Sequence, residues 1–539
     1  MYKPYLFYTP SPSGHGLLCG LLRHGGVFRA QHVARSAALG VALVLSAALC
    51  AAAASAQTLK TLPPKVLQAL QKAQVPAEAM SLLVVDAEGT LPPRLSHRAE
   101  VAVNPASVMK LVTTLAALDL LGPQFTWKTP VYVDGSISAS GTLNGSVYIQ
   151  GRGDPKLVME RIWLLVRRLQ GIGIRHIQGD LVLDRSLFDL PPTDPGDFDG
   201  ERLRPYNVAP DALLLNYASI VMTFVPDPAA QVARLQVDPP LAGVLTPTTV
   251  PLAASPASVV SSAAAQSNMQ RADCIDYRAA LQADFSDPNR VRFLGRYPAG
   301  CGERVWPVAY ADPASFAARA FEGMWRASGG QLSGTVREGK LPAHLSRSAP
   351  TWESVSPALS EVVRDINKYS NNVMAQQLLL TLGLQLKDKG SLTAGREVLA
   401  EWWTQRWGVQ DQPIVDNGSG LSRRERISAA ALARMLQWAW QSPLMPELVS
   451  SLPIAGVDGT LKTRPGRATA NLGSAHLKTG SLRDVVAIAG YVHGNGKSSG
   501  SGIEGHTGKR WVLVAVINHP QANAARAALD AAVEWAQQP

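Results

Sequence analysis

The chain has 539 residues, of which 46% are hydrophobic and 17% are charged. This apolar content is enough for a sizeable core, and the length predicts two to four domains. A mainly disordered chain is excluded, because disorder requires low hydrophobicity together with a high charge density. The formal net charge of +10 is not gathered into clusters of Lys and Arg, so we expect no nucleic-acid partner.

The first 56 residues carry Lys and Arg but no Asp or Glu. They include an alanine-rich apolar run over residues 36–53 and end in the small-x-small site Ala54-Ser55-Ala56. This pattern is typical of a secretory signal peptide cleaved after Ala56, and it predicts export to the periplasm. An uncleaved anchor is the alternative, because about 20 apolar residues can span a bilayer. Peripheral membrane association and the oligomeric state stay open.

Two of the four cysteines, Cys19 and Cys50, leave with the signal peptide. The remaining pair, Cys274 and Cys301, predicts a disulfide, because an exported chain folds in an oxidising compartment. Metal binding is the alternative, but two thiols without a nearby histidine do not form a zinc site. No HExxH motif is present either, so we expect no metal.

The N-terminal part of the mature chain predicts helix and strand in turn. A helical pattern covers residues 57–75, and residues 81–86 are apolar enough for a buried strand. A second strand is expected within residues 91–103. An apolar helix is then expected from Ser107 up to the stop signal Gly122.

The middle of the chain, residues 125–345, has a different pattern. Short alternating segments, typical of β-hairpins, recur at residues 130–134, 145–150 and 179–184. Residues 226–268 are rich in Ala, Pro, Val and Ser, which predicts short strands joined by loops. We therefore expect one or two inserted β-rich domains here.

The C-terminal part returns to helices and ends in strands. Four helices are expected over residues 357–369, 373–386, 395–407 and 428–441. Three strands and a closing helix follow, over residues 475–481, 485–492, 511–518 and 522–537. Two strands from one end of the chain and three from the other predict a single sheet, and therefore an α+β fold built from both ends.

Three short motifs stand in order along the chain: Ser107-Val-Met-Lys110, Ser370-Asn371-Asn372 and Lys478-Thr479-Gly480. Each is weak alone, since a serine that starts a helix is often only an N-cap and a strand lysine is often only solvated. Together they are the set found in penicillin-binding proteins and class A β-lactamases. We therefore interpret them as one catalytic site.

The first motif contains what an activated serine needs. A serine hydroxyl is a poor nucleophile without a neighbouring base. Residues three apart in one helical turn share a face, so the Lys110 amine can reach the Ser107 oxygen. The amine must be neutral to take the proton, and partial burial and the cation of Lys478 would both lower its pKa.

The other two motifs supply relay and binding groups. Ser370, between two helices, can pass a proton to the leaving group, and Asn372 can bond the substrate amide and the catalytic lysine. Lys478 and Thr479 can hold a substrate carboxylate, while Gly480 keeps the strand edge open for a peptide. The oxyanion hole is expected from two backbone N–H groups, those of Ser107 and Ser481.

The chain resembles the low-molecular-mass class C penicillin-binding proteins, the D-alanyl-D-alanine carboxypeptidase/endopeptidases of the penicillin-binding protein 4 type. The long gap between Lys110 and Ser370 matches the insertion that is typical of that class. The family loop commonly reads Asp-Gly-Ser-Gly-Leu-Ser, whereas Asn417 precedes the first glycine here. Four segments carry the resemblance, at residues 105–110, 369–372, 416–423 and 476–482.

The resemblance implies a penicillin-binding/β-lactamase-like transpeptidase domain, with an antiparallel five-stranded sheet flanked by helices. Two β-rich domains would be inserted between the first two motifs. The implied division assigns residues 57–125 and 346–539 to the DD-peptidase domain, 126–205 and 305–345 to inserted domain II, and 206–304 to inserted domain III. Within the insert, residues 197–206 resemble the segment that approaches the substrate side chain.

The resemblance also implies a two-step acyl transfer on peptidoglycan peptide stems. Ser107 would attack the carbonyl before a terminal or cross-linking D-alanine, and water would release the acyl-enzyme without a cofactor. β-Lactam antibiotics would acylate Ser107. The alternatives are a serine β-lactamase or esterase with the same motifs, and a non-catalytic protein that binds the cell wall.

Overall fold

The computed structural model describes residues 58–253, 274, 276–462, 473–495 and 508–538. The expected signal peptide, with its cleavage site after Ala56, lies outside the described residues. Within the described ranges, no helix combines the length and the apolar character that are needed to cross a bilayer.

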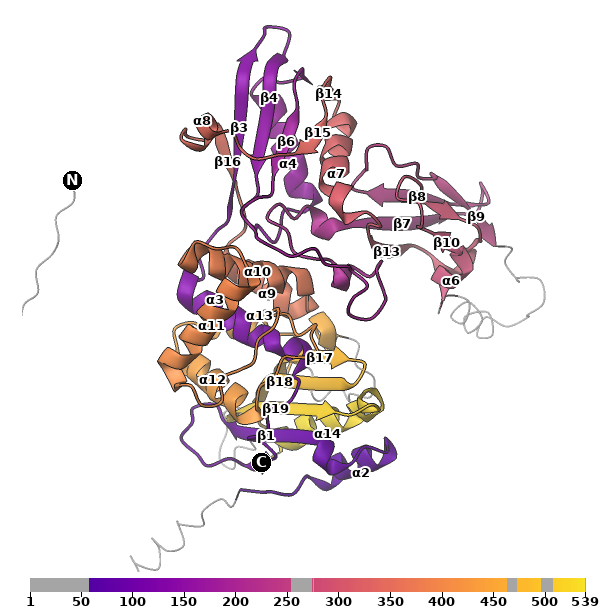
Figure 1. Ribbon diagram of the computed structural model, residues 1–539. Helices are drawn as coiled ribbons and strands as arrows, with labels where there is room; N and C mark the ends of the chain where they lie inside the picture. The colour runs from indigo at the N-terminus through magenta and orange to yellow at the C-terminus, as the bar shows by residue number, and fades with distance from the viewer. Residues whose placement is uncertain (1–57, 254–273, 275, 463–472, 496–507, 539) are drawn as a thin grey trace, which may run out of the picture. The chain divides into compact units, whose positions relative to one another are not determined.

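A five-stranded antiparallel sheet joins the two ends of the chain (Figure 1). Strand β1 pairs along its whole length with β19, from Met80 opposite Ile517 to Asp86 opposite Trp511. The second strand, expected within residues 91–103, is short and corresponds to β2. The predicted α+β fold with a five-stranded sheet is thus confirmed. In sheet order the strands are β17 Ala475–Leu482, β18 Val485–His493, β19 Arg510–Asn518, β1 Met80–Asp86 and β2 Leu95–His97.

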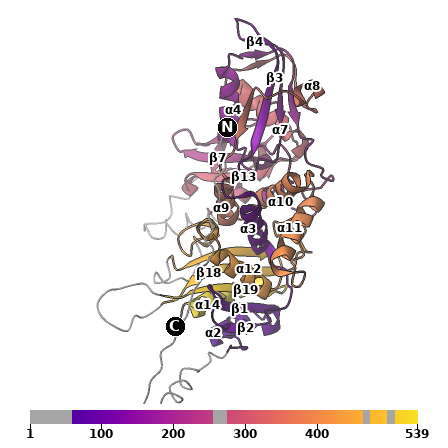
Figure 2. The same cartoon turned by 90° about the vertical axis from the view of Figure 1, so that its left-hand side faces the viewer.

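Helices cover both faces of this sheet, because the side chains of a strand point alternately to its two faces. In β1, Leu83 and Val85 enter one core, and Leu82 and Val84 enter another. Figure 2 shows α3, α9, α10 and α11 grouped on one side of the strands. The first core contains α3 Lys110–Leu121, α9 Leu359–Tyr369, α10 Asn372–Lys387, α11 Leu392–Trp407, α12 Ala429–Gln441 and α13 Met445–Ser451, and the second contains α2 Pro64–Lys72 and α14 Arg526–Gln537.

The chain between α3 and α9 forms two larger sheets and a small one (Figure 1). The first sheet contains β3 Lys128–Ile137, β4 Thr142–Gln150, β5 His176–Ile177, β6 Leu181–Asp184, β14 Gln331–Leu332, β15 Val336–Glu338 and β16 Trp352–Val355. The second contains β7 Ser219–Asp227, β8 Val232–Asp238, β9 Thr249–Ala253, β12 Tyr297–Pro298 and β13 Arg304–Ala309. The small sheet pairs β10 Ala283–Asp284 with β11 Arg292–Phe293.

Two long helices in this inserted region were not expected from its hairpin pattern. They are α4, Met159–Gly171, and α7, Pro313–Ala327. Helix α4 buries Ile162, Leu165 and Leu169, whose spacing of three and four residues is that of one helix face. The prediction of short strands alone therefore missed these two helices. The helical spacing of the apolar residues in α4 was the sequence signal that could have revealed that helix. Two shorter helices are α6 Tyr277–Leu281 and α8 Ala343–Ser346.

The inserted region leaves the helical core and returns to it through neighbouring strands. Strand β16 pairs antiparallel with β3, so that Val355 lies opposite Lys128. The two ends of the insert are thereby held side by side, just before α9 and just after α3.

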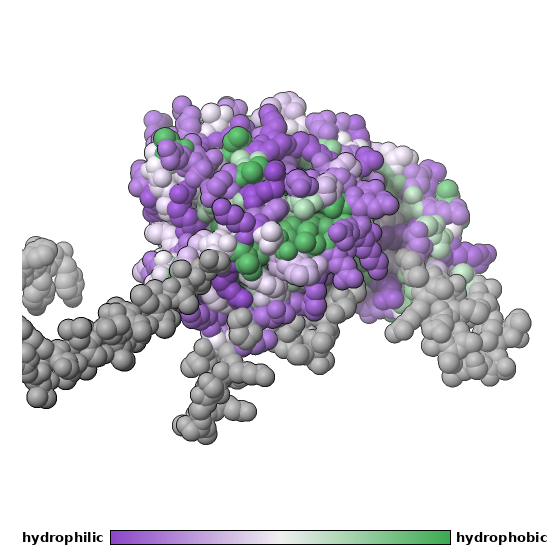
Figure 3. All heavy atoms as spheres, turned by 90° about the horizontal axis from the view of Figure 1, so that it is seen from below, coloured by the Kyte–Doolittle hydropathy of each residue, from purple (hydrophilic) through white to green (hydrophobic). Residues whose placement is uncertain are grey.

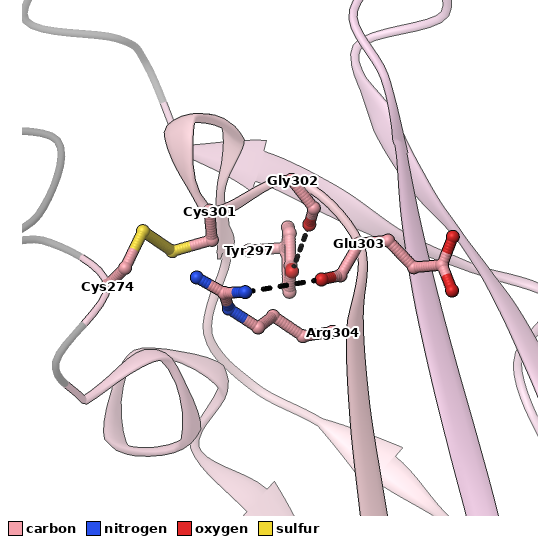
Figure 4. The surroundings of a disulfide bond; sticks show 6 residues. All are labelled: Cys274, Tyr297, Cys301, Gly302, Glu303 and Arg304. Carbon is pink, nitrogen blue, oxygen red and sulfur yellow. Dashed lines mark hydrogen bonds between the residues drawn. A yellow bond between two sulfur atoms is a disulfide. The ribbon is translucent and has the colours of Figure 1, made fainter. Parts of the chain in front are cut away.

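Cys274 and Cys301 form a disulfide in the second inserted sheet region, with their Cα atoms 5.2 Å apart (Figure 4). Cys301 is buried and follows β12. Beside it, the hydroxyl of Tyr297 donates a hydrogen bond of 2.6 Å to the carbonyl of Gly302. The covalent link joins the segment after β12 to the residues just before α6, and the hydrogen bond ties the same segment to β12.

The face drawn in Figure 3 is mostly hydrophilic, with a larger apolar patch near its middle and smaller apolar areas elsewhere. Scattered apolar residues on a surface are normal for a soluble domain. The larger apolar side chains of the strands and helices lie in the cores described above.

Trp127 joins the helical core to the first inserted strand and offers a test of this packing. Its ring is buried, and its indole N–H donates a hydrogen bond of 2.9 Å to Thr381 Oγ1 in α10. We expect Trp127→Ala to lower the free energy of unfolding by about 3–5 kcal/mol, because it leaves a large cavity. Urea unfolding followed by circular dichroism measures this loss. Trp127→Phe keeps most of the packing and should cost clearly less; equal losses would contradict a packing role.

Candidate active site

Ser107 lies in a 3₁₀ turn, η2 Ala106–Met109, which leads directly into α3. The turn is set by Asn104, whose side-chain oxygen accepts a hydrogen bond of 2.9 Å from the Ala106 N–H. Ala106 has a φ of 47°, a conformation that costs energy for a residue with a side chain and that clusters at functional sites. The sequence predicted Ser107 as the start of a helix, and the α-helix itself begins at Lys110.

Lys110 is fully buried, and its amine contacts three oxygens. Nζ lies 3.0 Å from Ser107 Oγ and 2.6 Å from Asn372 Oδ1, and it also contacts the carbonyl of Ser419. Burial lowers the pKa of Lys110 to about 7, although the nearby charge of Glu425 acts in the opposite direction. A neutral amine therefore exists near physiological pH.

The three partners of Lys110 suit a neutral amine. An ammonium group has three donors, whereas an amine has two N–H bonds and one lone pair. The amide oxygen of Asn372 and the carbonyl of Ser419 can only accept hydrogen bonds. The Ser107 hydroxyl can instead donate to the lone pair, which is the arrangement that a proton transfer from Ser107 to Lys110 requires.

The second motif occupies the tight turn between α9 and α10. Ser370 has a φ of 56°, which turns the chain after α9. Asn371 caps α10, because its side-chain oxygen accepts a hydrogen bond of 3.1 Å from the N–H of Met374. The turn leaves the side chains of Ser370 and Asn372 free to face the two lysines of the site.

Lys478 links the second motif to the third. Its Nζ donates hydrogen bonds of 2.9 Å to Ser370 Oγ and 2.8 Å to the carbonyl of Thr479. The side chain is fully buried, and burial followed by the charge of Lys110 lowers its pKa well below the ordinary value. The three motifs thus meet in two hydrogen-bonded groups, Ser107–Lys110–Asn372 and Lys478–Ser370, which the short chain segment from Ser370 to Asn372 joins.

The residues after Lys478 face different surroundings. Thr479 Oγ1 lies 2.7 Å from Thr460 Oγ1. A Cβ atom on Gly480 would lie 2.6 Å from the Pro105 carbonyl, so only glycine lets β17 approach the turn of Ser107 this closely. The Ser481 side chain is exposed and accepts a hydrogen bond of 2.6 Å from Arg526, so it joins neither of the two groups.

The outer edge of β17 is open next to Ser107. β17 is an edge strand of the sheet, and only its first half is covered, where the Leu477 N–H donates 2.9 Å to the Pro453 carbonyl. Beyond Lys478, no strand in the described part of the chain pairs with this edge. Because N–H groups alternate in direction along a strand, the N–H of Ser481 points the same way as that of Leu477. This edge can accept a peptide.

Two contacts with the site were missed by reasoning from the sequence. The Asn372 amide donates a hydrogen bond of 3.1 Å to the carbonyl of Tyr206, which belongs to the inserted region. Only the resemblance of residues 197–206 to a family segment pointed there. The second is Glu425, which is buried beside the loop that contacts Lys110, and no motif indicated it.

The loop before Glu425 explains the unusual Asn417. The Asn417 side-chain oxygen accepts hydrogen bonds from the N–H of Ser419, at 2.9 Å, and from its hydroxyl, at 2.8 Å. Its amide group donates 2.9 Å to the carbonyl of Leu421. Asn417 therefore shapes the loop that carries the Ser419 carbonyl, a role that needs an amide and no charge.

The centre of the site offers two amines, two hydroxyls and one amide. Among the described residues, no group of three or more His, Cys, Asp or Glu could hold a metal ion. A serine hydroxyl beside a buried amine can perform nucleophilic attack with general base assistance.

Residues 63–539 match the model of the D-Ala-D-Ala carboxypeptidase 3 (S13) family. The chain belongs to this family. The resemblance to D-alanyl-D-alanine carboxypeptidases of the penicillin-binding protein 4 type is thereby confirmed, and the chain is a serine DD-peptidase, a hydrolase.

Relatives agree with this S13 assignment, and a solved structure has the same fold. The chain is 28% identical over 409 residues to a D-alanyl-D-alanine carboxypeptidase of Actinomadura sp. (strain R39), covering 72% of this chain and 71% of that one. It is 25% identical over 393 residues to the D-alanyl-D-alanine carboxypeptidase DacB of Haemophilus influenzae, covering 72% and 77%. The fold matches the crystal structure of penicillin binding protein 4 from H. influenzae with a TM-score of 0.64 and 22% identity, over 87% of this chain and 99% of the other.

Gly420 tests how closely the loop must approach Ser107. Its φ is 80°, and an added Cβ would lie 2.0 Å from the Ala106 carbonyl. We expect Gly420→Ala to displace the turn of Ser107, lower kcat/KM at least tenfold and lower the melting temperature. Gly408 is a matched control, because its φ is 78° and a Cβ there meets no atom within 4 Å. Gly408→Ala should cost only about 1 kcal/mol of stability and leave kcat/KM unchanged; similar activity losses in both variants would contradict the contact.

Proposed function

We propose that Ser107 is the nucleophile of this S13 peptidase and that Lys110 is its general base. The observation that carries the proposal is the position of the buried Lys110 amine, 3.0 Å from Ser107 Oγ, with two pure acceptors at its other sides. An activated serine requires a neutral base within hydrogen-bond distance. The amine supplies it without a metal or a histidine.

Acylation begins when Ser107 Oγ attacks the carbonyl carbon before the last D-alanine and its proton passes to Lys110 Nζ. The carbonyl oxygen becomes an oxyanion, which the backbone N–H groups of Ser107 and Ser481 hold. The Ser107 nitrogen lies 3.2 Å from where a Cβ on Gly480 would sit, so β17 passes close to the Ser107 N–H. The attack therefore takes place between the turn η2 and the edge of β17.

Collapse of the oxyanion breaks the C–N bond and releases the D-alanine amine, which needs a proton. Lys110 can return the proton directly, or Ser370 can pass it on, since Lys478 donates to Ser370 Oγ at 2.9 Å. Water then attacks the ester on Ser107 with Lys110 as base, and the acid product leaves. Each bond formed on Ser107 is thus broken again in one cycle.

The substrate binds as an added strand along β17. Main-chain hydrogen bonds to an open strand edge give affinity to an extended peptide. Lys478 and Thr479 hold the terminal carboxylate, Gly480 allows the close approach, and Asn372 bonds the amide of the peptide. The Ser481 side chain is tied to Arg526, so we assign to Ser481 its backbone group alone.

The proposed substrates are peptidoglycan stems that end in D-Ala-D-Ala and the cross-links between D-alanine and diaminopimelate. β-Lactams acylate Ser107 and leave slowly, because they place a reactive amide where the peptide bond lies. We further propose that residues 1–56 direct export and are cleaved after Ala56, so that the enzyme works in the periplasm.

The division into a DD-peptidase domain and two inserted domains is also part of the proposal. Pairing of β16 with β3 favours extending inserted domain II to residue 355. Pairing of β13 with β7 favours assigning residues 305–309 to inserted domain III. The helical core on either side of the insert then forms the peptidase domain.

Replacement of Ser107 tests the nucleophile. We expect Ser107→Ala to abolish covalent labelling by a fluorescent penicillin and to lower peptide hydrolysis by at least about 10³-fold, because no acyl-enzyme can form. Ser450→Ala, an exposed serine change in α13, is the control and should change neither. Mass analysis of cross-linked muropeptides distinguishes loss of one D-alanine from cleavage of the cross-link. Labelling of Ser107→Ala at the wild-type level would overturn the proposal.

The pH dependence tests the base. Because Lys110 acts as the neutral amine and its pKa is lowered to about 7, kcat/KM should rise with pH through about pH 7. Below that value it should fall about tenfold per pH unit, as the amine becomes protonated. A pH profile on a peptide ending in D-Ala-D-Ala measures this. An acid limb near pH 4 to 5 would instead point to an Asp or Glu base.

A further inference from the structure

Glu425 is a carboxylate without contact to solvent, and no step of the proposed reaction uses it. It is 0% exposed and lies between the loop of residues 416–420 and helix α12. One oxygen, Oε1, accepts hydrogen bonds from three successive backbone N–H groups, at 3.1 Å from Asp416, 3.1 Å from Asn417 and 2.9 Å from Gly418. The other oxygen, Oε2, is buried and has no hydrogen-bond partner among the described residues.

The loop that Glu425 holds is the loop that contacts the first turn of α3. The Gly418 carbonyl accepts a hydrogen bond of 2.7 Å from Thr113 Oγ1, and the Ser419 carbonyl accepts one from Lys110 Nζ. The backbone bends sharply here, with a φ of 72° at Gly418. Oε1 of Glu425 holds the three N–H groups of residues 416–418 together on one side of this bend. It thereby fixes the direction of the Gly418 and Ser419 carbonyls on the other side.

The charged groups near Glu425 lie in the site and in its own loop, where Arg426 donates a hydrogen bond of 2.8 Å to the Glu425 carbonyl. Lys110 is the lysine whose pKa it raises, and Lys478 is the second buried lysine of the site. Asp416 is the neighbouring anion and is itself paired with Arg424 at 2.7 Å. Burial raises the pKa of Glu425 to about 7, and the charge of Glu425 raises the pKa of Lys110.

We propose that Glu425 is a positioning residue that sets both the place and the protonation of Lys110. It fixes the place through the loop that presents the Ser419 carbonyl, and it acts on the protonation through its charge, without touching Lys110. The inference rests on the proposed role of Lys110 as the base of the reaction. It assigns to Glu425 no contact with substrate.

Glu425→Gln removes the negative charge of the side chain and keeps its size and shape. The amide oxygen of Gln can accept the same three N–H groups, so the loop should persist, but the anion is lost. Without it Lys110 loses its proton more easily, and the acid limb of kcat/KM should move to lower pH by about one unit. Glu361→Gln, the same change at an exposed position of α9, is the control and should leave the limb in place.

Glu425→Asp makes the complementary change, because it keeps the anion and withdraws it by one methylene from the three N–H groups. We expect kcat/KM to fall at least tenfold while the acid limb stays within a few tenths of a unit of the wild-type pH. This variant also keeps the test open if Glu425→Gln does not fold, which melting curves of both variants would reveal.

The outcomes separate cleanly. A limb that moves in Glu425→Gln and stays in Glu425→Asp supports the inference. An unmoved limb in a folded Glu425→Gln variant, or an equal shift in both variants, overturns it. If instead Ser107→Ala still reacts with penicillin, the proposed function itself fails, so the two failures are distinguishable.

Discussion

The burial of the Lys110 amine is the constraint on which the rest of the site depends. A buried ammonium without a carboxylate in direct contact loses its hydration at a high cost, whereas the cost for a neutral amine is much smaller. The partners that replace water are Ser107, Asn372 and the Ser419 carbonyl. These lie in three segments that are far apart in the sequence, so the fold must bring all three to within hydrogen-bond distance of one nitrogen atom.

The five-stranded sheet meets that requirement by joining the two ends of the chain. Pairing of β1 with β19 places the turn of Ser107, which follows β2, over the strands of the C-terminal part. Gly480 then allows β17 to lie directly against this turn. The large insertion does not disturb the arrangement, because β3 and β16 are paired and return the chain to the point where it left. The carbonyl of Tyr206 reaches from the insert to Asn372 of the site.

The sequence allowed the motifs, the five strands and most helices of the core to be predicted, because each is a local pattern. Ser107 and Lys110 are three residues apart, and the strands are apolar runs between turn residues. Glu425 could not be found in this way. It stands among Arg423, Arg424 and Arg426, a charged run that is typical of a solvated surface, and its burial arises only when the preceding loop folds around it.

Other differences have equally physical causes. Helix α4 was missed because the segments on both sides of it alternate between apolar and polar residues, a pattern that predicts strands. Within the helix itself, Ile162, Leu165 and Leu169 follow the helical period. From the sequence, a role was predicted for the backbone N–H of Ser481, and the surroundings of its side chain were left open. The structure pairs this side chain with Arg526 on the neighbouring helix, a long-range contact that no local pattern encodes.

The balance of charge in the site follows from which groups touch and which do not. Two lysines are buried in the site, and the charge of Lys110 adds to burial in lowering the pKa of Lys478. An aspartate at the position of Asn372 would fix the proton on Lys110 by direct contact, and the amine could then no longer accept one from Ser107. The nearby anion is Glu425, and its hydrogen bonds go to backbone N–H groups. Its charge therefore raises the pKa of Lys110 without a direct contact between the two side chains. Lys110 can then both take a proton from the nucleophile and release it to a leaving group.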